Sequence, residues 1–322
     1  MRTVVPIVRS VVLICVVSIL SHQSHAQSIT TGDGKLEIGL GIGPMFFLGD
    51  LGGTKGYGKT FVKDLNMPLT KISKGLYLSY YPAEWLGFRL AANLGTIEGD
   101  DAQAPNKGGA EVDRKMRNLS FKSSILEGYF ATEIYPTVFF EGYDGLAGKL
   151  RPYGLIGIGV YHFNPKAKDV DGTWVELHPL HLEGQGFAQY PTRKEYKLTQ
   201  MEVPMGVGFK YYLKENMYIG LEILHRKLFT DYVDDVSTKY IDPVYFSSYL
   251  SAADAVRAKR LYYRGTYPGA ITRPRDILSY QRGDPKQNDA YFSTIIRFGW
   301  RLNGENSPNG RALRQLRCPN FY

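Results

Sequence analysis

One segment has the spacing of a phosphate-binding loop. GTKGYGKT, at residues 53–60, matches a pattern in which glycines expose backbone N–H groups and a lysine contacts phosphate. That chemistry requires a helix directly after the loop, with its N-terminus facing the phosphate. Here FVKDLNMPLTKIS follows, which contains Pro68 and leads into an extended segment. We therefore predict a basic, glycine-rich loop without nucleotide binding.

Two other segments hold side chains that could bind metal. His178 and His181 in HPLH are three residues apart, but no third ligand accompanies them. Asp231, Asp234 and Asp235 in FTDYVDDVSTKY lack the ligand spacing and glycine of a calcium loop. We interpret the histidines as solvated loop residues, and the aspartates as a rim cluster that caps backbone amides or binds a partner. No metal, cofactor or catalytic residue is predicted.

The C-terminal stretch NGENSPNGRALRQLRCPNFY could contact another protein. Arg311, Arg314 and Arg317 recur every third residue, which is the spacing of one helix face. Two interpretations stay open. The stretch is a solvated chain end, or it is a periplasmic docking peptide whose arginines meet an acidic surface while Phe321 and Tyr322 act as anchors.

The elements that would carry these residues are strands, because apolar and polar residues alternate over long stretches. In LGFRLAANLG every second residue from Leu86 to Leu94 is apolar, and the residues between are Gly, Arg, Ala and Asn. LEIGLGIG and MEVPMGVGFKYYL repeat this pattern. We predict eight strands, at 36–43, 72–81, 86–95, 120–135, 151–163, 201–213, 218–229 and 291–302.

Such strands fit a soluble sheet with one wet face, or a membrane barrel with its apolar side chains outward. An even number of strands can close and remove the sheet edges. Connections also alternate in length: 82–85 and 214–217 are tight and 136–150 is moderate, whereas 49–71, 97–118, 164–198 and 230–289 are long. We predict an all-β, eight-stranded antiparallel transmembrane β-barrel with short periplasmic turns and long extracellular loops.

Aromatic residues near the strand ends are the third argument for a membrane barrel, because such barrels carry aromatic girdles at both interfaces. The predicted girdles are Phe46, Phe47, Phe163 and Phe229 at one end, and Tyr80, Trp85, Tyr135, Tyr211, Tyr218 and Trp300 at the other.

The N-terminus reads as a secretory signal peptide. Arg2 and Arg9 form a positive segment before the apolar run SVVLICVVSIL, and SHAQS supplies a cleavage site after Ala26. Eleven apolar residues are too few to cross a bilayer as a helix. We predict a signal peptide at 1–26, a barrel at 27–302 and a periplasmic tail at 303–322. Export makes nucleic-acid binding implausible despite a formal charge of +8.

The polar faces of the strands place five acids and five bases inside the barrel. An eight-stranded barrel is just wide enough for its own side chains, and an unpaired buried charge is costly. We predict a plug of ion pairs, with a charged conduit in a wider barrel as the alternative. Function then lies in the loops, the rim or the tail. The ten residues are Glu37, Glu127, Glu133, Glu202, Glu222, Arg89, Lys210, Arg226, Arg297 and Arg301.

Four segments carry a resemblance to a known family: LEIGLGIGPMFFLGDLGG (36–53), KGLYLSYYPAEWLGFRLAANLGTIEGDD (74–101), HRKLFTDYVDDVS (225–237) and RCPNFY (317–322). In these the chain resembles the PorG-like outer-membrane proteins of Bacteroidota. The resemblance implies a barrel of the type IX secretion system, a machine that also serves gliding motility in some members. It further implies partners in a periplasmic ring, a PorK-like lipoprotein and a PorN-like protein.

Three functions follow as hypotheses. The first is a non-enzymatic barrel that anchors a type IX secretion complex and contacts outer-membrane lipids. The second is a structural or adhesive barrel of the small OmpA or OmpX type, which works through the loops 164–198 and 230–289. The third is a rim enzyme acting on lipid, which would depend on one of His162, His178, His181 and His225.

Overall fold

The computed structural model describes residues 35–51, 69–103, 111–140, 149–214, 216–265, 278 and 280–302. The predicted signal peptide, the loop 53–60 and the predicted tail with Arg311, Arg314, Arg317, Phe321 and Tyr322 lie outside these residues.

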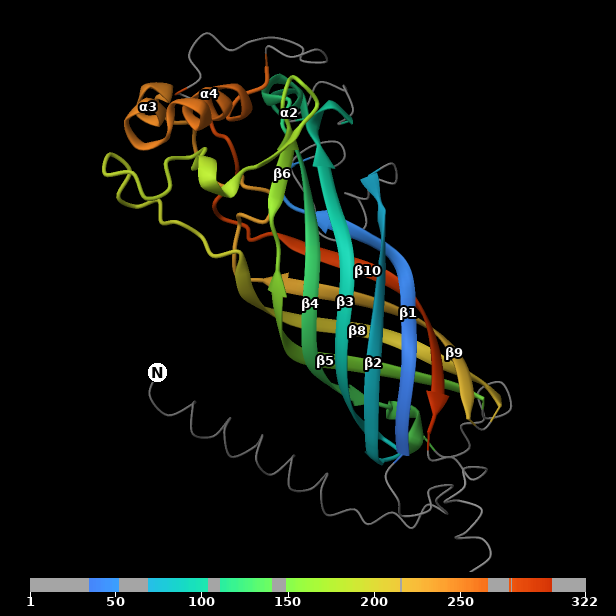
Figure 1. Ribbon diagram of the computed structural model, residues 1–322. Helices are drawn as coiled ribbons and strands as arrows, with labels where there is room; N and C mark the ends of the chain where they lie inside the picture. The colour runs from blue at the N-terminus through green and yellow to red at the C-terminus, as the bar shows by residue number, and fades with distance from the viewer. Residues whose placement is uncertain are drawn as a thin grey trace, which may run out of the picture. The chain divides into compact units, whose positions relative to one another are not determined.

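Eight long strands pair antiparallel and close into a barrel (Figure 1). The strand order is β3-β2-β1-β10-β9-β8-β5-β4, and β3 pairs with β4 to close the ring. This confirms the predicted fold class. The strands are β1 (Lys35–Leu48), β2 (Lys71–Ala83), β3 (Leu86–Asp100), β4 (Ser120–Ile134), β5 (Leu150–His162), β8 (Thr199–Lys214), β9 (Met217–Leu228) and β10 (Ala290–Arg301).

The outer surface of the barrel is apolar. On β5, Ile156, Ile158 and Val160 are exposed, whereas Leu155 and Tyr161 on the opposite face are buried. The same alternation holds on the other long strands, so the predicted apolar faces point outward. A closed sheet that exposes leucine, isoleucine and phenylalanine all round is suited to lipid rather than to water.

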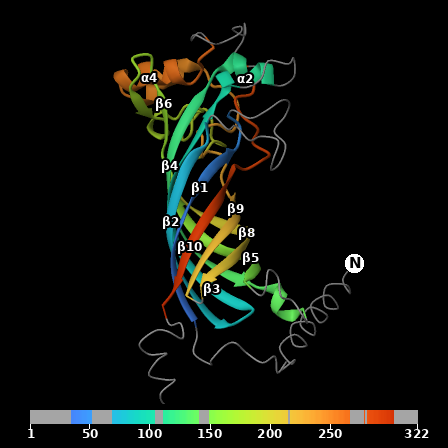
Figure 2. The same cartoon turned by 90° about the vertical axis from the view of Figure 1, so that its right-hand side faces the viewer.

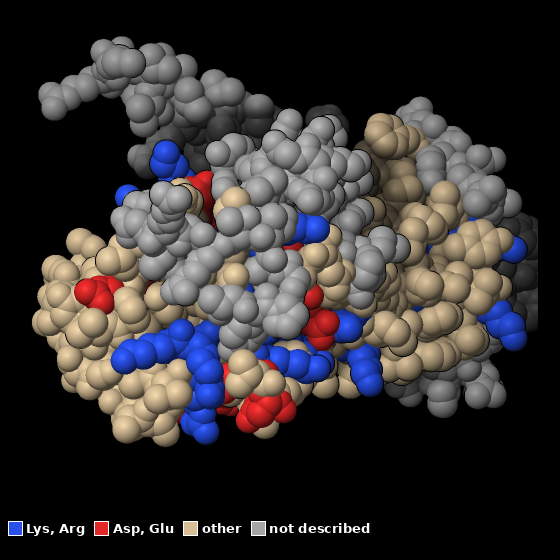
Figure 3. All heavy atoms as spheres, turned by 90° about the horizontal axis from the view of Figure 1, so that it is seen from above, with Lys and Arg blue, Asp and Glu red and all other residues tan. Residues whose placement is uncertain are grey.

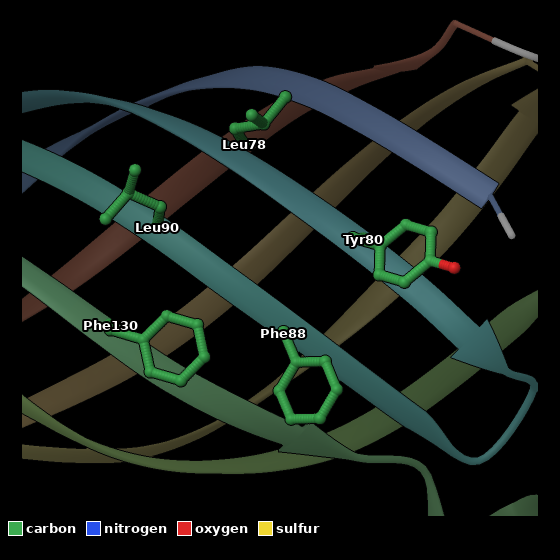
Figure 4. Close-up of a pocket in the computed structure, with 5 residues that line it drawn as sticks. All are labelled: Leu78, Tyr80, Phe88, Leu90 and Phe130. Carbon is green, nitrogen blue, oxygen red and sulfur yellow. The ribbon is translucent and has the colours of Figure 1, made fainter.

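A shallow apolar groove on β2, β3 and β4 illustrates this outer surface (Figure 4). Leu78, Tyr80, Phe88, Leu90 and Phe130 line it, and the Phe88 and Phe130 rings stack at 5.9 Å between centroids. These residues lie on the outer face of the strands, where lipid chains would contact them.

Short and long connections lie at opposite ends of the barrel (Figures 1 and 2). Ala83 pairs with Leu86 and Lys214 pairs with Met217, so two of the turns are tight. The third short connection contains the 3-10 helix Pro136–Phe139. The long connections at the other end hold most of the remaining structure.

The long connections form a folded head rather than plain loops, which the sequence did not predict. They contain α2 (Glu111–Arg117), β6 (Pro165–Lys168), β7 (Trp174–Glu176), α3 (Phe246–Tyr249) and α4 (Ala252–Leu261), together with short 3-10 turns. An apolar core joins head and barrel, because Leu182, Val233 and Phe246 of the head belong to one buried cluster with Phe121 and Tyr161 of the barrel. Among the described residues, no helix is both long and apolar enough to cross a bilayer.

The predicted aromatic girdles are partly wrong. Tyr80, Trp300 and Phe229 are exposed as expected, and Trp85, Tyr211 and Phe47 are partly exposed. Four of the ten residues are buried instead: Phe46, Phe163, Tyr135 and Tyr218. Tyr135 and Tyr218 share the inward face with the charged residues, because Tyr135 follows Glu133 by two positions and Tyr218 precedes Glu222 by four. Phe163 is buried in the same way, two positions after the buried Tyr161. Phe139 and Phe140, in the short connection, add exposed aromatic rings at the turn end.

A charge on the outer wall tests whether this surface faces lipid. We expect Leu90→Arg, at a side chain 60% exposed in the middle of β3, to destabilise the barrel in lipid vesicles by about 2–4 kcal/mol, because lipid must desolvate the guanidinium. Denaturant unfolding in vesicles measures this change.

Val244→Arg is the matched control, since Val244 is 65% exposed in the head. We expect this variant to change the unfolding free energy by less than about 0.5 kcal/mol. Equal effects of the two substitutions would mean that Leu90 faces water.

Candidate functional site

The barrel interior near the turn end holds a chain of ion pairs. Lys210 Nζ lies 2.7 Å from Glu37 Oε2 and 3.7 Å from Glu133 Oε2. Arg301 contacts the other Glu37 oxygen at 3.3 Å. Arg89 lies 2.5 Å from Glu133. All except Arg301 are almost fully buried, so each charge depends on its partner rather than on water.

The chain of ion pairs continues to the middle of the barrel through Glu222. Arg89 Nη1 lies 2.5 Å from Glu222 Oε2, and Arg297 contacts the other oxygen of the same carboxylate. One acid therefore bridges two guanidinium groups that belong to β3 and β10. Seven of the ten predicted lumen residues form this continuous network.

The remaining three predicted lumen residues lie nearer the head. Arg226 pairs with Glu127, with a 3.1 Å contact from Nε to Oε2. The Tyr291 hydroxyl lies 2.6 Å from Glu127 Oε2 and 2.6 Å from Glu202 Oε2, which links the two carboxyl groups. Glu202 has no basic partner within ion-pair distance among the residues described, and it reaches Arg226 only through this shared tyrosine and Glu127.

Tyrosines complete the lumen, and the sequence reasoning did not identify them. Tyr81 and Tyr153 donate to Glu133 at 2.7 Å and to Glu222 at 2.6 Å. Lys210 Nζ lies 4.6 Å from the ring centre of Tyr81 and 4.5 Å from that of Tyr218, which are cation–π distances. Paired charges and aromatic rings thus fill the interior at this level.

The head contains a second charged cluster, which is acidic. Asp231, Asp234 and Asp235 are buried in it, and Asp234 has the first of the two roles predicted for the cluster, the capping of backbone amides. Asp234 accepts hydrogen bonds from the backbone N–H groups of Leu51 at 3.2 Å and Val236 at 3.0 Å. Asp235 instead accepts a hydrogen bond from the Tyr196 hydroxyl at 2.8 Å.

Two buried arginines hold the long connections together. Arg117 pairs with Asp101, at 2.7 Å from Nε to Oδ2, and also donates to the backbone carbonyls of Asp50 and Arg282. Arg282 lies 3.0 Å from Glu183 Oε1 and donates to the Asp235 carbonyl. These contacts join segments from all four long connections.

Acids outnumber bases in the buried part of the head. Burial raises the pKa of Asp235 to about 7 and that of Asp231 to about 8, and it also raises the pKa values of Asp234 and Asp289 well above their ordinary value. Repulsion between Asp234, Asp289 and Asp231 acts in the same direction. The cluster therefore retains protons at neutral pH that an exposed aspartate would lose.

The described residues offer no metal centre. No group of three or more His, Cys, Asp or Glu side chains in this part of the chain is placed to hold a metal ion. His178 Nε2 lies 2.8 Å from the Tyr196 carbonyl oxygen, and its ring centre is 6.2 Å from that of His181. His162 and His225 belong to the barrel strands β5 and β9, whereas the other two histidines lie in the head.

The chain is similar to solved structures of outer-membrane proteins. It is 13% identical to OprG from Pseudomonas aeruginosa, with 84% of this chain and 96% of that chain covered and a TM-score of 0.39. It is 9% identical to Ail of Yersinia pestis, solved with the heparin analogue sucrose octasulfate, with 84% and 99% covered and a TM-score of 0.35. It is 7% identical to Neisserial surface protein A, with 84% of this chain and 97% of that chain covered and a TM-score of 0.34.

No family model and no curated protein matches the sequence. The strand pairing and the burial pattern identify the fold by themselves: the chain forms an eight-stranded barrel of the outer-membrane type.

Neutralising the central acid of the lumen tests the ion-pair plug. We expect Glu222→Gln to lower the free energy of unfolding by about 3–5 kcal/mol, because Arg297 would stay buried without a counter-charge and Arg89 would keep only Glu133. Glu176→Gln is the control, since Glu176 pairs with Lys166 at an exposed site and should cost about 0–1 kcal/mol. Denaturant titration in vesicles compares them, and a difference below about 1 kcal/mol would contradict the plug.

The acidic head should lose stability as pH rises. A carboxyl group whose pKa is higher in the folded than in the unfolded chain binds its proton more tightly when folded, so stability falls from about pH 4 to pH 8 and then levels off. Hydrogen exchange at the amides of Leu51 and Val236, corrected for intrinsic rates, should show this decline.

Asp234→Asn should flatten that pH profile, and Asp254→Asn on the exposed face of α4 should leave it unchanged. Protection that is independent of pH in the unmodified chain would contradict proton retention by the cluster.

Proposed function

We propose that this chain is a non-enzymatic outer-membrane barrel that anchors a periplasmic ring of a type IX protein secretion complex. The filled lumen is the observation that supports an outer-membrane barrel acting without conduction. Lysine and arginine side chains bridge Glu37, Glu133 and Glu222 across the interior. Each of these three carboxylates therefore has a basic partner. A plugged barrel works through its ends and outer surface rather than through conduction.

The anchoring of a periplasmic ring in a type IX complex rests on the resemblance to the PorG-like proteins. Under it, the short turns and the stretch from Arg311 to Tyr322 face the periplasm and meet a PorK-like lipoprotein and a PorN-like partner. Among the described residues, the connections after Ala83 and Lys214 are tight turns, which would let a ring approach the barrel closely there.

A specific observation favours a second candidate, a structural or adhesive barrel without a secretion role. The head has its own apolar core and buried arginine contacts, from Arg282 to Glu183 and from Arg117 to Asp101. A folded, ordered head at the loop end is more than a closed anchor requires, and it offers a rigid surface for contacts outside the cell.

Co-purification from outer membranes separates the two candidates. An affinity tag inserted between Lys194 and Glu195, which are both exposed in the head, leaves the turn end free. We expect mild detergent extracts to yield a ring lipoprotein and its partner with the tagged barrel. Removing the chain after Leu302 should leave the barrel folded but reduce that yield roughly tenfold, since interface anchors contribute about 2 kcal/mol or more.

A bare barrel, recovered under conditions that preserve the ring, would overturn the anchoring role and favour the adhesive one. Undiminished recovery with the shortened chain would place docking on the short turns instead of the tail. Deletion of the whole chain should also stop secretion of cargo proteins, and normal secretion would contradict the proposal.

A further inference from the structure

Four side chains at the loop end of the outer wall form a basic surface, here named the lysine patch. They are Lys122 on β4, Lys166 and Lys168 on β6, and Trp174 on β7. Strand pairing places them on one face, because Lys122 is opposite Lys166 and Lys168 is opposite Trp174. Figure 3, which looks onto the loop end, shows Lys and Arg side chains gathered in a row along one side of it.

The lysine patch faces outward, not into the head. On β6 the alternate residues Pro165 and Ala167 are buried, and Ala167 belongs to the apolar core of the head. Val175, between Trp174 and Glu176 on β7, packs against the same core. The lysines and the tryptophan therefore point away from the core into the surroundings.

The patch continues the lipid-facing wall without a break. Along β5 the outward side chains are Ile156, Ile158 and Val160, followed by His162 at the end of the strand. Two residues separate the end of β5 from the start of β6, and both strands pair with β4. On β4 itself, Lys122 lies four residues from the exposed Leu126, or about 13 Å along the strand. An apolar wall that turns basic over this distance matches the passage from acyl chains to headgroups.

The charges of the patch are only partly balanced. Glu98 is shared between Lys71 at 3.0 Å and Lys122 at 3.3 Å, and Glu176 lies 2.9 Å from Lys166. Lys168 makes no carboxylate contact within ion-pair distance in the described part of the chain; its closest aromatic contact is Trp174. The three lysines of the patch, together with the neighbouring Lys71, thus face two glutamates.

Two further acids border the patch, and both accept hydrogen bonds from nearby backbone. Asp100 accepts from the Ala102 N–H and Asp171 from the Thr173 N–H, each at the end of a strand or in a turn. They limit the basic surface on the side away from the apolar wall. The basic surface therefore opens toward the level at which lipid headgroups would lie.

Trp174 gives the patch the character of a membrane interface. Its side chain is 47% exposed, and its ring centre lies 5.5 Å from Lys122 Nζ and 5.3 Å from Lys168 Nζ. Tryptophan is enriched where acyl chains meet headgroups, because its ring is apolar and its N–H is polar. Lysine at the same level attracts anionic lipid.

We propose that the lysine patch binds the phosphate groups of a phosphorylated lipid in the membrane leaflet next to the long connections. Lys122, Lys166 and Lys168 contact the phosphates, Trp174 lies beside the headgroup, and the acyl chains lie along the apolar wall of β4 and β5. This role does not depend on the secretion complex, because the patch belongs to the barrel and the head alone.

Lipid binding to the purified full chain in neutral detergent tests the proposal. The probe is lipid A, which carries two phosphates, and Trp174 fluorescence in a variant with Trp85→Phe and Trp300→Phe reports contact at the patch. Inorganic phosphate and phosphatidylcholine are the comparison ligands. We expect saturable binding of lipid A alone, and a loss of at least about tenfold in affinity in the triple variant K122Q/K166Q/K168Q, because each lysine contributes roughly fivefold near anionic lipid.

The matched control is K194Q/K239Q/K259Q, which removes the same charge from exposed lysines elsewhere on the head. It should bind lipid A within about twofold of the parent chain, since these lysines belong to the long connections and do not continue the outward face of a barrel strand. A triple substitution changes the quenching of Trp174 fluorescence, so native mass spectrometry also measures how much lipid each variant retains. A difference in gel migration between heated and unheated samples confirms that each variant is folded.

Three results would overturn the proposal. Equal weakening by both triple variants would mean attraction by net charge alone. Binding of inorganic phosphate as tight as that of lipid A would indicate a site for a free anion. Absence of lipid A binding to the folded parent chain would remove the site altogether.

Discussion

The barrel depends on one constraint: charges in its lumen must find partners inside the protein. Eight strands enclose a space that side chains fill, so water cannot screen Arg89 or Glu222. The chain meets the constraint by bridging, since Lys210 contacts two acids and Glu222 contacts two arginines. A shared partner makes each ion pair depend on the next, and the network joins strands that are not neighbours in the sheet. The same contacts that stabilise the closed wall also fill its interior.

Because the interior is polar and the exterior apolar, strand alternation carries information that loops do not. The eight strands and the ten lumen charges could be predicted, since both follow from a period of two residues. The same parity places Tyr135 and Tyr218 inside, because Tyr135 is two residues from Glu133 and Tyr218 is four residues from Glu222. An aromatic residue near a strand end suggests a girdle only when its parity is outward.

The head could not be predicted, for a physical reason. Its segments lack a period, and contacts between distant residues define its structure: Leu51 donates to Asp234, 183 positions away, and Arg282 pairs with Glu183, 99 positions away. Local sequence favours such contacts no more than many others. The spacing of the aspartates at 231, 234 and 235 marks an unusual group, but only the folded head reveals that all three are buried and that Asp234 accepts from two backbone amides.

Lumen and head therefore treat buried carboxyl groups in opposite ways. In the lumen nearly every acid has an arginine or lysine within ion-pair distance, so opposite charges balance one another there. In the head two arginines serve a larger number of acids, and burial raises the pKa of Asp231 and Asp235 toward neutral values. Charge in the lumen is thus balanced by opposite charge, whereas charge in the head is reduced by protons that buried carboxyl groups retain. The lysine patch lies at the boundary between these two regions.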